Sequence, residues 1–98
     1  MRVYLSTTPE GVERINRDGF SDIRYGFTLE GVMVHTNAIH GVGFCVLAID
    51  VPDDEIRPYC FYEEIAGEEH AYEACVPAVL LNRCRAVRVD DVAESTPN

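Results

Sequence analysis

The sequence predicts a single small α+β domain, rich in antiparallel strands and with one helix near its start. The chain has 98 residues, fewer than two separate domains usually need. Hydrophobic residues make up 47% of it and charged residues 26%, as in an ordinary globular protein. Short apolar segments separated by glycine and proline turns favour strands over long helices. We expect residues 1–90 to fold as one domain and residues 91–98 to form a polar tail.

The helix is predicted over residues 9–18. Thr8 is a favourable N-cap, and Pro9 suits the first helical position. Gly19 stands where a glycine commonly ends a helix. The apolar residues of this segment share one face, so we expect Arg14 on the side that faces solvent.

Strands are expected at residues 3–5, 31–35, 44–51, 69–76 and 83–89. Segment 44–51 is apolar almost throughout, so it should be a central strand that is covered on both faces. Segment 69–76 alternates, which predicts Ala71, Glu73 and Cys75 on one face. Arginines alternate with small apolar residues in the last segment, as is typical of an edge strand.

The remaining segments are shorter and less regular. Pro52 is predicted to end the strand before it and to start a single helical turn over residues 52–56, and residues 77–82 are predicted to form one helical turn or less. Loops are expected at 21–30 and 37–43, and residues 58–65 fit a strand or a loop equally well. Five aromatic residues are expected in the core: Tyr4, Phe20, Phe27, Phe44 and Tyr72.

The charge of the chain limits its partners. Eight arginines and seventeen acids give a net charge of −9, and there is no lysine. The missing lysine excludes an ordinary P-loop and lysine Schiff-base chemistry. Residues 50–73 hold nine acids and one base, Arg57. Such a surface repels phosphate, so duplex nucleic acid is a poor partner, whereas a basic protein suits it.

Cysteines, histidines and apolar runs predict neither a metal site nor a membrane span. The four cysteines at 45, 60, 75 and 84 form no closely spaced pair, so we expect buried free thiols and no metal. His35, His40 and His70 match no ligand spacing. No apolar run approaches the roughly 20 residues of a membrane helix, and we find no export signal, so a cytoplasmic location is expected.

Four segments, in order, resemble ADP-ribosyltransferase-like domains, and the chain looks like a small, divergent bacterial member of that superfamily. VYLSTTPEGVERINRDGF resembles their opening strand, Ser/Thr-Pro cap, helix and glycine stop. GVMVHT resembles the second strand, and VLAIDVP resembles the central strand. AYEACVPAVLLN resembles the late strand that carries a glutamate. The resemblance covers about residues 2–90.

The resemblance implies a split β-sheet, two small antiparallel sheets opposed like a clamp, with NAD in the cleft. The family's ribose-binding histidine, nicotinamide-stacking tyrosine and catalytic glutamate fall on Leu5, Met33 and Glu73, which should converge on one cleft. Of these, only Glu73 keeps the family residue. The resemblance therefore implies Glu73 as the catalytic residue and NAD, or a related nucleotide, as the cofactor. The implied cofactor-binding residues are Tyr4, Leu5, Ser6, Thr7, Met33 and His35.

Two other functions remain open. A related RNA 2′-phosphotransferase would need several basic groups for phosphate, and this chain offers few. A non-catalytic interaction module on the same scaffold, such as a toxin–antitoxin, phage or immunity component, would use the acidic segment 50–73 to bind a basic protein. The predicted edge strand is compatible with a monomer or a weak homodimer.

Overall fold

The computed structural model describes residues 1–38 and 44–89. Most of the expected loop 37–43, with His40, and the expected tail 91–98 lie outside the described residues. The strands are β1 (Arg2–Thr7), β2 (Ile23–Tyr25), β3 (Leu29–His35), β4 (Cys45–Asp50), β5 (Cys60–Ile65), β6 (Glu68–Val76) and β7 (Ala86–Arg88). The helices are α1 (Pro9–Asp18), α2 (Asp53–Ile56), α3 (Ala78–Leu81) and the 3₁₀ turn η1 (Arg57–Tyr59).

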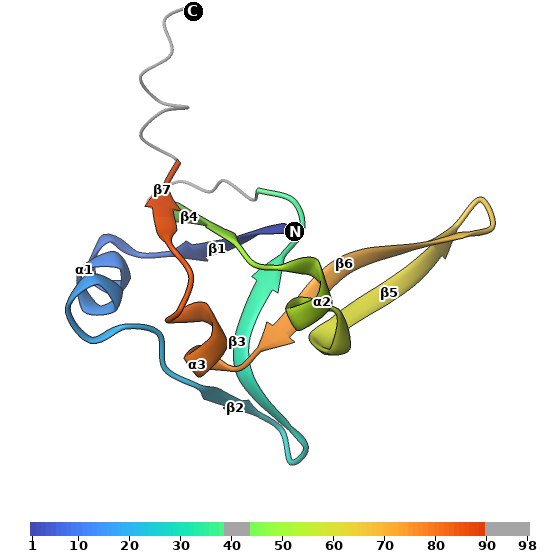
Figure 1. Ribbon diagram of the computed structural model, residues 1–98. Helices are drawn as coiled ribbons and strands as arrows, with labels where there is room; N and C mark the ends of the chain where they lie inside the picture. The colour runs from blue at the N-terminus through green and yellow to red at the C-terminus, as the bar shows by residue number, and fades with distance from the viewer. Residues whose placement is uncertain (39–43, 90–98) are drawn as a thin grey trace, which may run out of the picture.

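All pairings in the sheet are antiparallel, and the prediction of an α+β domain dominated by strands is confirmed (Figure 1). The strand order is β5-β6-β3-β1-β4-β7, and β2 pairs with β3. The main core lies between one face of the sheet and the helices. Val3, Val34 and Ile49 from the sheet belong to the same buried cluster as Val12, Ile56 and Leu81 from the three helices.

The sheet parts between its two middle strands. β1 pairs with β4 over six residues, but its register with β3 is a single pair, Tyr4 with His35. Beyond that pair, β3 turns away from β1 toward β2 (Figure 1). The expected pair of separate, opposed sheets is therefore wrong, because one residue pair joins the two halves into one sheet.

The predicted limits of α1 are confirmed. The Thr8 hydroxyl accepts a hydrogen bond from the Gly11 backbone N–H at 3.1 Å, and Pro9 opens the helix. Gly19 ends it with a φ of +82°, a backbone conformation that residues other than glycine rarely adopt. The two single helical turns, α2 and α3, also form where they are predicted.

The predicted burial of β4 is confirmed, although β4 is an interior strand next to the end strand rather than a middle strand of the sheet. Five consecutive residues, from Cys45 to Ile49, are buried, and the strand lies between β1 and β7. β7 is the end strand that the arginine pattern predicted, but it is shorter than expected. The backbone N–H groups of Arg83 and Cys84 donate to the carbonyls of Leu80 and Leu81, so the turn after α3 uses the residues that were expected to begin the strand.

Two segments are more regular than predicted. The expected loop 21–30 contains β2 and the start of β3, which pair as a short hairpin. The ambiguous segment 58–65 forms most of η1 and then β5, which pairs with β6. Ala66 (φ 53°) and Gly67 (φ 83°) make the turn between β5 and β6, as in a two-residue hairpin loop with both residues at positive φ.

A register shift changes the faces of β6. Glu73 pairs with Phe61, whereas Ala71 pairs with Tyr62. Neighbouring residues of β5 point to opposite faces of the sheet. Ala71 therefore lies on the face opposite to Glu73 and Cys75, and the expectation that all three share one face is wrong, because the bulge interrupts the alternation.

The aromatic residues are less buried than predicted. Phe20 is buried, and Tyr4 is half-buried. Phe27 is fully exposed because it lies in the turn between β2 and β3, and Phe44 and Tyr72 are also exposed. The core is instead made mainly of aliphatic side chains from β1, β3, β4 and β6. No helix within the described ranges is long and apolar enough to cross a membrane.

Candidate functional site

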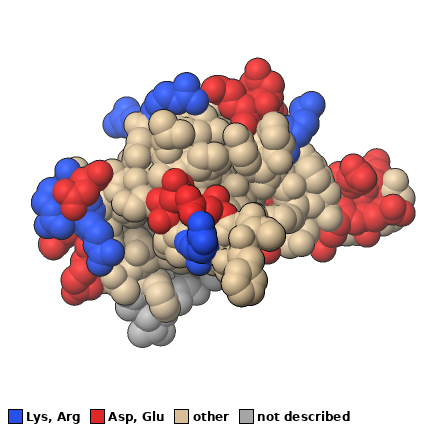
Figure 2. Space-filling model, turned by 90° about the horizontal axis from the view of Figure 1, so that it is seen from below, with Lys and Arg blue, Asp and Glu red and all other residues tan. Residues whose placement is uncertain are grey.

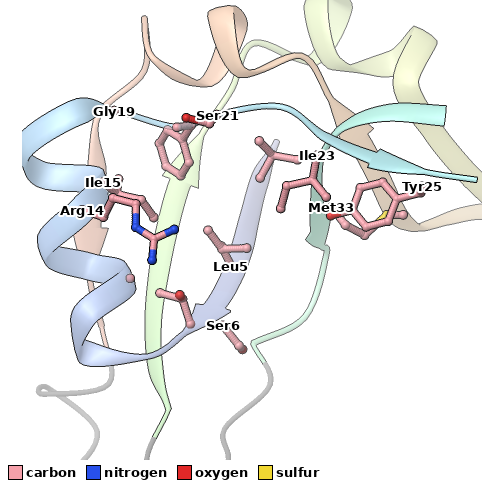
Figure 3. Close-up of a pocket in the computed structure, with 13 residues that line it drawn as sticks. Leu5, Ser6, Arg14, Ile15, Gly19, Ser21, Ile23, Tyr25 and Met33 are labelled. Atoms are coloured by element: carbon pink, nitrogen blue, oxygen red, sulfur yellow. The ribbon is translucent and has the colours of Figure 1, made fainter.

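A pocket of about 430 Å³ lies where the sheet parts between β1 and β3 (Figure 3). Its volume is in the range of small-molecule sites in proteins. Its walls come from the end of β1, from α1 and the segment that follows it, and from β2 and β3. The lining residues are Leu5, Ser6, Thr7, Gly11, Arg14, Ile15, Gly19, Phe20, Ser21, Ile23, Tyr25, Val32 and Met33.

The lining combines an apolar surface with a few polar groups. The buried Phe20 ring and the half-buried Tyr25 and Met33 offer flat or polarisable contacts for a planar ring. Hydroxyl groups come from serine, threonine and tyrosine side chains. Arg14 is the one charged residue among the lining residues that the structure describes, and its side chain points from α1 toward β1 in Figure 3. An anionic group would therefore meet a cation in this pocket.

A close contact between α1 and β1 fixes this geometry. A Cβ atom built on Gly11 would lie 2.0 Å from the Thr7 Oγ1 atom, so a larger residue at this position would require the Thr7 side chain to move. Arg14 is three residues further along α1 and lies on the same side of the helix as Gly11. Arg14 is exposed, as expected, and it also lines the pocket because its side of the helix faces β1.

The segment after α1 is attached to α3 at two points. The Asn82 Oδ1 atom accepts from the Phe20 backbone N–H at 2.7 Å, and Asn82 Nδ2 donates to the Phe20 carbonyl at 3.0 Å. The Ala78 backbone N–H at the start of α3 donates to Asp22 Oδ1 at 2.8 Å. These bonds hold the part of the pocket wall that contains Phe20 and Ser21.

Four of the expected site residues line the pocket: Leu5, Ser6, Thr7 and Met33. The other three, Tyr4, His35 and Glu73, form a row across three strands. Tyr4 pairs with His35, which in turn pairs with Glu73. Residues that pair directly point to the same face of a sheet. His35 Nδ1 lies 3.5 Å from Glu73 Oε2, and both side chains are about one-third exposed.

The row lies outside the wall of the pocket, and Leu5, which is next to Tyr4 on β1, points to the opposite face of the sheet from the row. Met33 is two residues from His35 on β3, so it shares the face of the row while also lining the pocket. Leu5 and Met33 meet at the pocket as expected, and Glu73 lies outside its lining, one strand further along the sheet.

Sequence reasoning missed several lining residues, notably Arg14, Ser21 and Tyr25. The signal for Arg14 was its spacing of three from Gly11, but this spacing becomes informative only once Gly11 is known to contact β1. Tyr25 was assigned to a loop, and it lines the pocket because β2 pairs with β3.

The cysteines are free thiols among the described residues, as expected. Cys45 and Cys75 are buried, whereas Cys60 and Cys84 are half-buried. Burial raises the pKa of Cys60, Cys75 and Cys84 above the usual thiol value, which keeps these groups protonated and unreactive at neutral pH. Within residues 1–38 and 44–89, no three metal-ligating side chains gather around one point.

The chain was compared with known proteins at three levels. No protein-family model, no curated protein and no solved structure matches it. The function is therefore inferred from the parted sheet, the pocket and the row of polar side chains outside its wall.

Proposed function

We propose that the pocket binds NAD or a related nucleotide and that the protein is an ADP-ribosyltransferase-like domain. One observation carries the proposal. Leu5, Ser6, Thr7 and Met33, which the sequence resemblance assigns to nucleotide binding, line a single pocket at the parting of the sheet. The first three come from β1 and the fourth from β3, the two strands that part at the pocket.

The lining matches the parts of a dinucleotide. Phe20, Tyr25 and Met33 would contact a heteroaromatic ring. The Arg14 guanidinium would bind a phosphate oxygen, since arginine recognises phosphate with two parallel N–H groups. Hydroxyl groups at the end of β1 would bind a ribose. Such sites commonly combine an apolar wall with a small number of polar groups that set orientation.

The row of Tyr4, His35 and Glu73 would supply the catalytic carboxylate. During transfer, the bond between the ribose anomeric carbon and the nicotinamide nitrogen breaks, and nicotinamide leaves with the electron pair. An acceptor then attacks that carbon and loses its proton. The Glu73 carboxylate, whose Oε2 atom lies 3.5 Å from His35 Nδ1, would stabilise the positive charge that develops on the ribose.

Titration calorimetry with NAD tests the binding step. We expect heat of binding with the wild-type protein and a clear loss of affinity for Arg14→Gln. Arg17→Gln is the matched control, because Arg17 is exposed on the same helix and does not line the pocket. If the folded wild-type protein produces no heat at millimolar NAD, or if both variants weaken binding equally, the proposal is wrong.

A further inference from the structure

The hairpin of β5 and β6 projects from the body of the protein. Its outer part, Tyr62–His70, is here called the arm. Figure 1 shows it extending away from the helices and the rest of the sheet. Every residue of the arm is exposed, so both faces of this ribbon are open to solvent. A two-stranded ribbon with no covered face has little stability of its own, which suggests that the arm is kept for a reason other than packing.

Acidic side chains occupy both faces of the arm, and they gather at the projecting end of the molecule in Figure 2. Glu63 and Glu68 share one face, and Glu64 and Glu69 share the other. Glu64 pairs directly with Glu69 across the two strands, an arrangement that destabilises a hairpin. Among the described residues, the His70 Nε2 atom lies 3.7 Å from Glu68 Oε2.

The arm also has an unpaired edge and exposed apolar groups. β5 is the end strand of the sheet in the described part of the chain, so its outer backbone groups have no strand partner there. Tyr62 and Ile65 are 42% and 53% exposed and lie on opposite faces of β5. An extended peptide that paired with this edge would bring its side chains beside an acid and an apolar group on each face.

We propose that β5 binds an extended, arginine- or lysine-rich segment of another protein by strand addition. The backbone edge would supply hydrogen bonds, as in other peptide sites of this kind. The glutamates would select cationic side chains, and Tyr62 offers a ring on which arginine can stack. A cation between Glu64 and Glu69 would relieve their repulsion. A second copy of this chain is disfavoured as the occupant, since each copy carries the same arm and a net charge of −9.

This inference does not depend on the nucleotide pocket, because no arm residue lines that pocket. The probe is a labelled, end-blocked peptide in which arginine alternates with threonine. It has about ten residues, enough to extend past β5 at about 3.3 Å per residue. Fluorescence anisotropy measures its binding. A second peptide of the same sequence carries N-methyl groups on alternate residues, which keeps every charge but removes the N–H donors of one edge.

Two protein variants separate the arm from the general charge of the molecule. Glu64→Gln with Glu69→Gln removes two charges from one face of the arm. Glu10→Gln with Glu13→Gln removes two exposed charges from α1 and is the matched control. We expect the arm variant to bind the first peptide about tenfold more weakly and the control to bind within about twofold of wild type, since close charge pairs contribute more than remote ones. Far-UV circular dichroism checks that both variants fold.

Three results would overturn the inference. The N-methylated peptide binding as tightly as the unmodified one would show that charge attracts the peptide without strand pairing. Equal losses in the two variants would mean that the arm has no special role. Concentration-dependent sedimentation of the wild-type protein that disappears in the arm variant would identify a second copy of this chain as the occupant.

Discussion

β4 and the β5–β6 hairpin both belong to the antiparallel sheet, but different interactions stabilise them. β4 contributes five consecutive buried residues, and strands pair with it on both sides. The outer part of the hairpin is exposed on both faces and carries glutamates where β4 carries aliphatic side chains. The comparison shows that one sheet can combine a packed body, which holds the pocket, with an arm whose two faces are both exposed.

The largest expected effect is the difference in the free energy of unfolding when isoleucine is replaced by alanine in the core and in the arm. Ile49→Ala removes a fully buried side chain from the core, and its cost should be about 2–5 kcal/mol in the free energy of unfolding. Ile65→Ala changes an exposed residue of the arm, and its cost should stay within about 0.5 kcal/mol. Urea unfolding measures both. Equal costs would contradict the division into a packed body and an unpacked arm.

The next effect concerns Glu73, which lies on β6 between the arm and the pocket. On the proposed function, Glu73→Gln removes the charge that stabilises the developing cation, so NAD turnover should fall about 100-fold. The free energy of unfolding should change by less than about 1 kcal/mol, because the side chain is partly exposed. Turnover is followed by nicotinamide release. The exposed Glu69→Gln on the same strand is the control, and an equal loss in both variants would contradict the role of Glu73.

A smaller effect is expected at the attachment of α3 to the pocket wall. Asn82→Ala removes both side-chain hydrogen bonds to Phe20 and should cost about 1–2 kcal/mol. Asn37→Ala, at an exposed position, should be nearly neutral. Thermal unfolding compares the two variants. If Asn82→Ala unfolds at the wild-type temperature, the two Asn82 hydrogen bonds do not help to hold the segment after α1.

The smallest effect is a pH dependence in the body. The Arg2 guanidinium, which donates two hydrogen bonds to Asp50 at 2.9 Å, lowers the pKa of that carboxyl below its usual value. The N-terminal amine lowers the pKa of Asp53 in the same way. Groups with a lowered folded pKa stabilise the protein above their unfolded pKa, about 3.9 for aspartate. That contribution is lost as the pH falls through the lower folded pKa.

Urea midpoints measured from about pH 6 down to about pH 2 test this pH dependence. The wild-type protein should lose stability with acid, and Asp50→Asn should lose less. Asp54→Asn, at an exposed position on α2, should follow the wild-type curve. Identical slopes for Asp50→Asn and wild type would show that the ion pair with Arg2 does not form in solution.

The same contrast explains what could be predicted from the sequence. Thr8, Pro9 and Gly19 predict α1 because caps act locally on the backbone. The apolar run of β4 predicts burial because few other environments accept it. Segment 69–76 was expected to be a strand, but segment 58–65 has no clear alternation, so β5 could be recognised only through its pairing with β6. The bulge opposite Phe61 also depends on that pairing, and this is why Ala71 was assigned to the wrong face.

The residues of the candidate site could also be predicted only in part. The resemblance of the opening segments assigned Leu5, Ser6, Thr7 and Met33 to a common site, and these residues line one pocket. Arg14 and Tyr25 could not be found in the same way. Arg14 depends on the close approach of Gly11 to Thr7, and Tyr25 depends on the pairing of β2 with β3. Both contacts join segments that are close in the sequence, but each depends on how the two segments pack against each other.

The most direct test of the account is an amide chemical-shift titration of the wild-type protein with NAD. We expect shifts for the pocket residues of β1, α1 and β3, in particular Ser6, Thr7, Arg14 and Met33, together with the segment after α1. The amides of the arm, from Tyr62 to His70, should remain unchanged and serve as an internal control. Shifts confined to the arm, or no shifts at millimolar NAD, would contradict the claim that the parting of the sheet is a nucleotide site.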